Sequence, residues 1–169
     1  MARTRIRPEG DGVRMELEDF EAELLRSLPA GVRALLEDPD PEDPAVARLF
    51  PTCVPDDDTV DTEVRRLIFD DLLSERLEAL DALAAILDRG SSHRGRLRVD
   101  LVDDEPALVL GVLNDVRLTL GARLGIDRLD RDEIDVDHPA APTLAVIDHL
   151  AWIQEQLLRA IDPTSVDDA

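Results

Sequence analysis

Residues 60–89 constrain the fold of this chain more than any other stretch. They contain no proline and no glycine, and their apolar side chains recur every three or four positions. The apolar positions are Val60, Val64, Leu67, Ile68, Leu72, Leu73, Leu77, Leu80, Leu83, Ala84 and Leu87. This spacing is typical of one buried face of an α-helix, which at 1.5 Å per residue would be roughly 45 Å long. Aspartates 56–58 are natural N-caps for this helix, and Arg89 with Gly90 ends it.

The composition favours the same interpretation. Aromatic residues make up 2% of the 169 residues, so the core must be aliphatic, and Leu and Ala are good helix formers. Further helical stripes are expected at 19–28, from Ala30 to about residue 37 after a break or kink at Pro29, and at about 105–124. Asp137 and Pro139 are expected to open a last helix, APTLAVIDHLAWIQEQLLRAI (141–161). The prediction is a mainly α fold, a bundle of about five helices. Residues 1–163 are expected to form a single helical domain, and 164–169 a mobile acidic tail.

Two stretches alternate with the period of a β-strand instead. Residues 4–18 alternate on both sides of the sequence EGDG and predict a hairpin with a glycine-rich turn. Leu97, Val99 and Leu101 alternate with polar residues and predict a third strand. A small antiparallel sheet of three strands, built on the N-terminal hairpin, is therefore expected beside the helices.

Charge and missing residue types exclude several functions. The net charge is −20 and every basic residue is arginine, which removes lysine Schiff-base and P-loop chemistry, and the chain has no tyrosine acid. The charge opposes general attraction to DNA and to anionic lipid. No apolar run approaches the roughly 18 residues of a membrane span, and the start MARTRIRPEG lacks the apolar region of a secretory signal. With Cys53 as the single cysteine, a cytoplasmic protein without an internal disulfide is expected.

The sequence LNDVRLTLGARLG (113–125) places a polar cluster in an otherwise apolar helix. Arg117 borders the apolar stripe, and a charge there needs a partner. Asp71 on the long helix falls where an apolar residue is expected, so an Arg117–Asp71 ion pair is predicted, with Glu75 as second choice and Gly121 allowing close approach. Asn114 and Asp115 complete the cluster. We expect it to fix helix register, because no nucleophile lies nearby in the sequence.

The arginines gather on the predicted strands. Arg3, Arg5 and Arg7 alternate on the first strand, and Arg94, Arg96 and Arg98 lie on or just before the third. If these strands share a sheet, one face is basic and is a candidate contact surface for nucleic acid. Glu16 and Asp100 would lie on the same face. We favour the interpretation that these two acids neutralise the arginines over a nucleic-acid site, because no aromatic side chain is available to stack on bases.

Metal and redox chemistry have little support. None of His93, His138 and His149 has a glutamate three residues before it, as bundle metal sites require, and the acidic runs 38–44 and 127–135 lack calcium-loop spacing. EDFE (18–21) supplies one acidic pair, as in magnesium-dependent helical pyrophosphatases, without a convincing second. Cys53 is a candidate redox residue. Its aspartate neighbours disfavour the thiolate form, whereas the N-terminus of the following helix favours it. No metal, cofactor or catalytic residue is expected, and the protein is interpreted as non-enzymatic.

Three blocks together resemble a known family. They are ARLFPTCVPDDDTVDTEVRRLIFDDL (47–72), LNDVRLTLGARLGI (113–126) and LAWIQEQLLRAI (150–161), with FEAELLRSL (20–28) in support. They resemble the actinobacterial family catalogued as domain of unknown function two-thousand-seventeen and labelled oxidative stress transcriptional regulator. The resemblance implies a cytoplasmic, oxidant-responsive regulator that works with the transcription apparatus through a partner such as a sigma factor. Cys53 stands where the family pattern has a small residue. Because the chain has one thiol, it cannot sense oxidants through an internal disulfide, and the remaining modes of action are partner binding and an intermolecular disulfide.

The sequence therefore predicts a regulatory protein that acts by contact with a protein partner bearing a basic surface, such as a sigma factor. Two alternatives stay open. The first is a direct DNA-binding regulator that uses the arginine-rich sheet. The second is a metal-dependent helical-bundle hydrolase, which would need four or more carboxylates converging on one inward-facing site. A homodimer is also left open.

Overall fold

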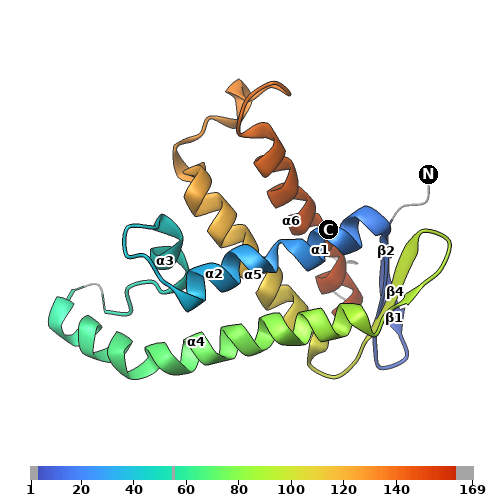
Figure 1. The fold of residues 1–169 in the computed structure, drawn as a ribbon, viewed down its shortest axis with the longest axis horizontal. Helices are drawn as coiled ribbons and strands as arrows, with labels where there is room; N and C mark the ends of the chain where they lie inside the picture. Colours follow the sequence, from blue (N-terminus) through green and yellow to red (C-terminus); the bar gives the residue numbers. More distant parts are fainter. Residues whose placement is uncertain (1–3, 55, 163–169) are drawn as a thin grey trace.

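The computed structural model describes residues 4–54 and 56–162. Arg3 of the predicted basic face and the predicted tail 164–169 lie outside them. The strands are β1 (Arg5–Glu9), β2 (Gly12–Glu18), β3 (Ser91–Ser92) and β4 (Arg96–Leu101). The helices are α1 (Asp19–Ser27), α2 (Pro29–Glu37), α3 (Pro44–Leu49), α4 (Asp58–Asp88), α5 (Glu105–Leu124) and α6 (Ala141–Ile161), with short 3₁₀ turns at Ile126–Arg128 and Arg131–Glu133 (Figure 1). The predicted mainly α fold with a small sheet is confirmed.

The helix boundaries follow local chemistry. The carboxylate of Asp57 accepts the backbone N–H groups of Thr59 and Val60, both at 3.0 Å, so α4 begins at an aspartate cap as predicted. Gly125 adopts the left-handed conformation, φ 66°, and ends α5. The last helix has the predicted bounds, Ala141–Ile161. Pro142 occupies its first turn, where a missing N–H costs nothing, and Asp137 lies in the preceding turn.

The antiparallel sheet has the strand order β1-β2-β4-β3, one strand more than predicted. In the first hairpin, Gly10 takes φ 59° in a two-residue loop, and a Cβ on Gly12 would lie 2.2 Å from the carbonyl oxygen of Leu101. The additional strand β3 joins β4 through Arg94 and Gly95, which both have positive φ. A non-glycine residue such as Arg94 rarely adopts that conformation, so the sequence did not indicate this turn.

The core lies where the inner face of the sheet meets the helices. Val13, Met15 and Leu17 of β2 and the three alternating apolar residues of β4 are buried. Helix α6 packs on β1 and β2, while α1 contacts β2 and the sheet end of α4 contacts β4 (Figure 1). The opposite face of the sheet carries its charged side chains, as the alternation predicted.

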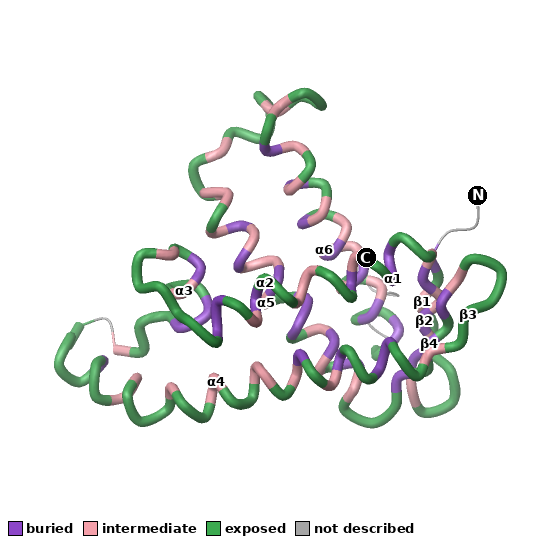
Figure 2. Tube along the Cα trace, viewed as in Figure 1, coloured by how far each residue is buried: buried purple, intermediate pink, exposed green. Residues whose placement is uncertain are grey.

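Helix α4 is covered along only part of its length. Its second half buries Leu80, Leu83, Ile86 and Leu87, while Figure 2 shows few buried residues in its first half. There Val60 is 45% exposed, Leu67 65% and Ile68 37%, although the spacing had assigned all three to the core. That expectation is wrong, because hydrophobic periodicity reveals an apolar face but not whether another element covers it. We call residues 58–77 the α4 arm.

Candidate functional site

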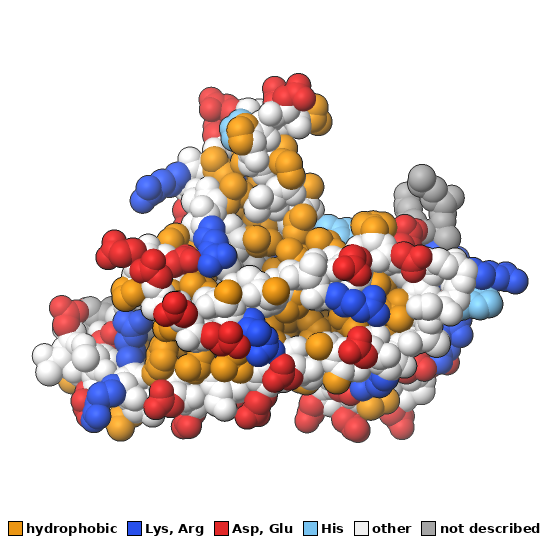
Figure 3. All heavy atoms as spheres, in the orientation of Figure 1, with side chains coloured by type: hydrophobic (Ala, Val, Ile, Leu, Met, Phe, Trp, Pro, Cys, Tyr) orange, Lys and Arg blue, Asp and Glu red, His pale blue; other side chains and the backbone are white. Residues whose placement is uncertain are grey.

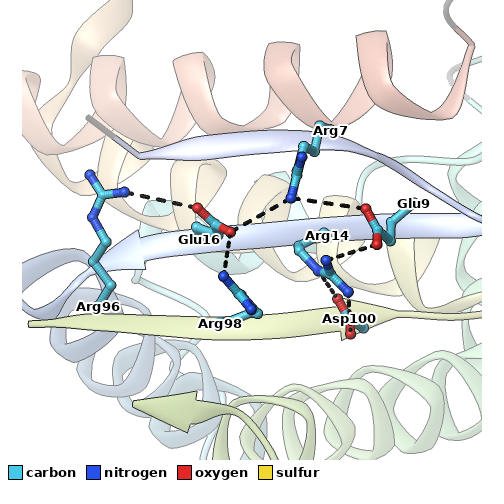
Figure 4. A network of polar contacts seen from close by, with 7 residues as sticks. All are labelled: Arg7, Glu9, Arg14, Glu16, Arg96, Arg98 and Asp100. Atoms are coloured by element: carbon cyan, nitrogen blue, oxygen red, sulfur yellow. Dashed lines mark hydrogen bonds and ion pairs between the residues drawn. The ribbon is translucent and has the colours of Figure 1, made fainter. Parts of the chain in front are cut away.

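The outer face of the sheet is a network of ion pairs (Figure 4). Glu16 lies at its centre. Its Oε1 is 3.1 Å from Nη2 of Arg98 and 3.9 Å from Nη2 of Arg7, and its Oε2 is 3.9 Å from Nη1 of Arg96. One carboxylate on β2 thus faces three guanidinium groups, one from β1 and two from β4.

A second centre of the same face is Arg14, which sequence reasoning overlooked. Its Nε is 2.6 Å from Oδ1 of Asp100, and its Nη1 is 2.8 Å from Oε1 of Glu9. The hydrogen bond from Arg14 lowers the pKa of the Asp100 carboxyl below its usual range. The structure therefore brings together the predicted arginines Arg7, Arg96 and Arg98 and pairs them with acids.

Two further predicted members of the basic face stay exposed. Arg5 lies on β1 opposite Glu16, and Arg94 lies at the β3–β4 turn. Neither has an ion-pair partner among residues 4–54 and 56–162. Arg94 contributes with its neighbours to a shallow hollow of about 300 Å³ at this end of the sheet. The free positive charge on the face is thus far smaller than its arginine count suggests.

We expect Glu16→Gln to expose this hidden basic surface. Without the carboxylate, Arg7, Arg96 and Arg98 lose their shared counter-charge, and phosphate- or sulfate-bearing polymers bind through such charges. The variant should elute from heparin at higher salt than the wild-type protein. Glu23→Gln is the matched control, because it removes the same charge from an exposed position on α1. Equal shifts in both variants would show that overall charge, and not the sheet, governs binding.

The predicted Arg117–Asp71 pair is not formed. Nη1 of Arg117 donates a hydrogen bond of 2.6 Å to Oε1 of Gln154 on α6, while Asp71 and Glu75 are exposed on α4. The prediction is wrong because the α4 residue that pairs with α5 is Arg76, through Asp115, while Asp71 is exposed. Gly121 is also not needed for helix approach, since a Cβ there would meet only Ile126, at 3.4 Å.

The pair that does join α4 to α5 has its charges reversed. Nε of Arg76 lies 3.4 Å from Oδ2 of Asp115, and the two side chains are 24% and 15% exposed. Burial raises the pKa of the Asp115 carboxyl, and Arg76 partly counteracts this. Arg76 also donates to the carbonyl oxygen of Leu49 at 3.0 Å and lies 5.4 Å from the centre of the Phe50 ring. Arg76 thereby links α3, α4 and α5. Asn114, also predicted to belong to this polar cluster, is exposed.

Beside the α4 arm lies an apolar cavity of about 190 Å³. It is lined by Leu49, Phe50, Pro51, Cys53, Arg65, Ile68, Phe69, Leu72 and Arg76. Cys53 is exposed and reduced, and its Sγ is 3.7 Å from the carbonyl oxygen of Pro51. The buried carboxylate of Asp61 accepts the N–H groups of Cys53 and Val54 at 2.6 and 2.9 Å. The backbone at Cys53 and Val54 is thus held by Asp61, while the Cys53 thiol stays accessible.

The open side of the arm combines apolar and acidic side chains. Val60, Val64 and Leu67 follow one another at helical spacing, and acidic residues surround this stripe. The exposed acids are Asp56, Asp57, Asp58, Glu63, Asp70, Asp71, Glu75 and Glu78. Figure 3 shows acidic side chains along the outer edge of this part of the molecule. Sequence reasoning missed this surface because it counted the stripe as core.

The acidic pair of EDFE and the neighbouring His149 make local structural contacts. Glu18 donates its backbone N–H to Oε2 of Glu21 at 2.8 Å, so the EDFE pair closes the first turn of α1. Nε2 of His149 is 2.9 Å from Oε1 of Glu21, and its ring stacks on Trp152 at 5.8 Å. Among the described residues, no group of three or more His, Cys, Asp or Glu side chains is placed to hold a metal ion. Across these same residues no helix combines the length and apolarity that crossing a membrane requires.

The fold and its surfaces define a mainly helical domain that carries a small antiparallel sheet with a charge-paired outer face. The chain belongs to the family described as domain of unknown function (DUF2017), whose family model matches residues 2–161. No solved structure matches the chain.

The curated relatives carry a regulatory name. The "Putative oxidative stress regulator AosR" of Mycobacterium leprae is 30% identical over 134 residues, which cover 73% of this chain and 61% of that protein. The "Oxidative stress regulator AosR" of Mycobacterium tuberculosis and that of Mycobacterium bovis are each 25% identical over 181 residues, covering 89% of this chain and 82% of theirs. The chain therefore spans less than two thirds of the M. leprae relative.

Proposed function

We propose that this chain is a non-catalytic regulator of the oxidative-stress response that acts by contact with a protein of the transcription apparatus. The names of the relatives support the regulatory role. The observation that carries the mode of action is the α4 arm, where Val60 and Leu67 are exposed on a helix whose second half is anchored in the core. Exposed apolar side chains that lie together mark interaction surfaces.

Charge complementarity indicates the kind of partner. The apolar stripe of the arm is surrounded by acids, so a second copy of this chain would bring like charges together. A basic amphipathic helix, such as one from a sigma factor, fits both features, because it offers apolar side chains to the stripe and cations to its border. Direct DNA binding is less favoured, since Glu16 and Asp100 counteract the arginines of the sheet.

Oxidant sensitivity would then belong to the complex. The chain has one thiol, Cys53, and a disulfide needs two. We therefore place the sensing step either in the partner or in an intermolecular disulfide through the exposed Cys53.

The test is to mix the purified chain with individually purified sigma factors and RNA polymerase core from its own source, and separately with promoter DNA. Isothermal titration calorimetry should detect a complex with one of the proteins that weakens as salt rises. Mobility-shift assays should detect no complex with DNA alone. A DNA shift that Arg98→Gln abolishes, with no protein bound, would instead establish the DNA-binding alternative.

A further inference from the structure

Arg117 has no acidic partner among the described residues, although the protein has 39 acidic residues and 19 arginines. Its side chain is partly buried between α5 and α6, and its Nε is buried without a hydrogen-bond partner. Among the described residues, no carboxylate lies within ion-pair distance of its guanidinium, which donates a hydrogen bond to the neutral amide of Gln154. A partly buried charge without a counter-ion is costly, so an anion bound at the accessible part of this guanidinium would lower that cost.

The guanidinium is held in place by hydrogen bonds to uncharged groups. Oε1 of Gln154 accepts from Arg117 at 2.6 Å, and Nε2 of Gln154 donates to the carbonyl oxygen of Leu110 at 3.0 Å. Because the NH₂ group of Gln154 is engaged, its oxygen must face Arg117. The amide therefore orients the cation without neutralising it, which makes Gln154 a positioning residue.

A cavity of about 220 Å³ opens beside this cation. Its polar lining residues are Arg48, Asn114, Arg117 and Asp127, and Leu118, Ile126 and Ile147 are among its apolar lining residues. Arg48 is ion-paired with Asp127, so it contributes little free charge. The unpaired charge of the cavity is therefore that of Arg117, and Asn114 is exposed beside it.

We propose that this cavity binds a small monocarboxylate with a short apolar chain. A planar guanidinium pairs with a carboxylate through two parallel hydrogen bonds. The apolar walls would hold a few carbon atoms, because the cavity is smaller than the roughly 300 Å³ at which sites for drug-sized ligands begin. A monoanion fits better than a phosphate, since the site offers one unpaired cation inside a protein of charge −20. The proposal goes beyond protein contact and gives the regulator an effector site.

Butyrate is the probe, with butyramide as its neutral counterpart and sodium chloride to match ionic strength. Two-dimensional NMR of the wild-type protein should show butyrate shifting the Arg117 Nε–Hε signal and the methyl groups of Leu118, Ile126 and Ile147. A ligand of six heavy atoms should bind with a Kd on the order of 1–10 mM. Butyramide should bind at least about tenfold more weakly, because it lacks the charge.

Variants separate the site from general charge effects. Arg117→Gln should weaken butyrate binding at least about tenfold, whereas Arg128→Gln should leave it within about twofold, because Arg128 is exposed on the adjacent turn. If Arg117→Gln does not fold, the wild-type comparison of butyrate with butyramide decides alone. Equal shifts with both compounds, or shifts spread over the exposed arginines, would overturn the proposal.

Discussion

Arg76→Met is expected to lower the free energy of unfolding by about 2–4 kcal/mol. Asp115 would lose the only cation within ion-pair distance of it among the described residues, and the carbonyl oxygen of Leu49 would lose a donor. The value lies somewhat below that of a fully buried pair, because the two side chains are 24% and 15% exposed. Urea unfolding monitored by circular dichroism measures the difference.

The matched control is Arg66→Met on the same helix. Arg66 pairs with Glu63 at 2.7 Å, but these side chains are 71% and 58% exposed, so this change should cost no more than about 0.5 kcal/mol. Replacing Arg76 by Met and Asp115 by Leu together should recover much of the single-variant loss, because neither charge then needs solvating. Equal losses for Arg76→Met and Arg66→Met would show that the Arg76–Asp115 pair is no more than a surface contact.

The same pair gives the loss a pH dependence. Burial raises the folded-state pKa of the Asp115 carboxyl, so its ionised form costs stability above that pKa and the cost disappears as pH falls through it. Without Arg76, which lowers this pKa, the cost should be larger and should reach its full value at a higher pH. The gap in stability between Arg76→Met and the wild type should therefore narrow on mild acidification.

The wrong choice of Asp71 as the charge partner shows where sequence reasoning stopped. The stripe on α4 predicted the helix and its length. The polar residues on α5 suggested a charge pair with α4 through Arg117, but the pair between the two helices joins Arg76 to Asp115. Asp71 and Arg76 are five positions apart, which places them roughly 140° apart around the helix axis. Choosing between them requires the rotation of α4 against α5, and tertiary packing alone sets that rotation.

The sheet was more predictable than the helix contacts. Strict alternation assigns each side chain to a face, so Glu16 and Asp100 could be placed beside the arginines without knowledge of the helices. Strand β3 was missed because it is two serines long and depends on a left-handed Arg94. The cavity beside Arg117 was equally out of reach, since its walls come from α3, α5, α6 and the turn after α5.

The α4 arm gives the second large expected effect, on binding. Replacing Val60 and Leu67 together by alanine should weaken the complex with the transcription partner at least about tenfold. Both residues are largely exposed, so the change opens no cavity, and the melting temperature should stay close to that of the wild type. Calorimetric titration of the partner and a thermal melt measure the two quantities on the same sample.

Leu158→Ala is the control for this variant, because Leu158 is 55% exposed on α6 and lies far from the arm in sequence and on a different helix. The acids around the stripe predict a second signature, since a basic partner should dissociate more readily as salt rises. Replacing Asp70 and Asp71 by asparagine should reduce that salt dependence, because the partner's cations would then face fewer charges. If Leu158→Ala and the Val60/Leu67 variant weaken the complex equally, or if salt does not change the affinity, the partner does not bind at the exposed stripe of the α4 arm.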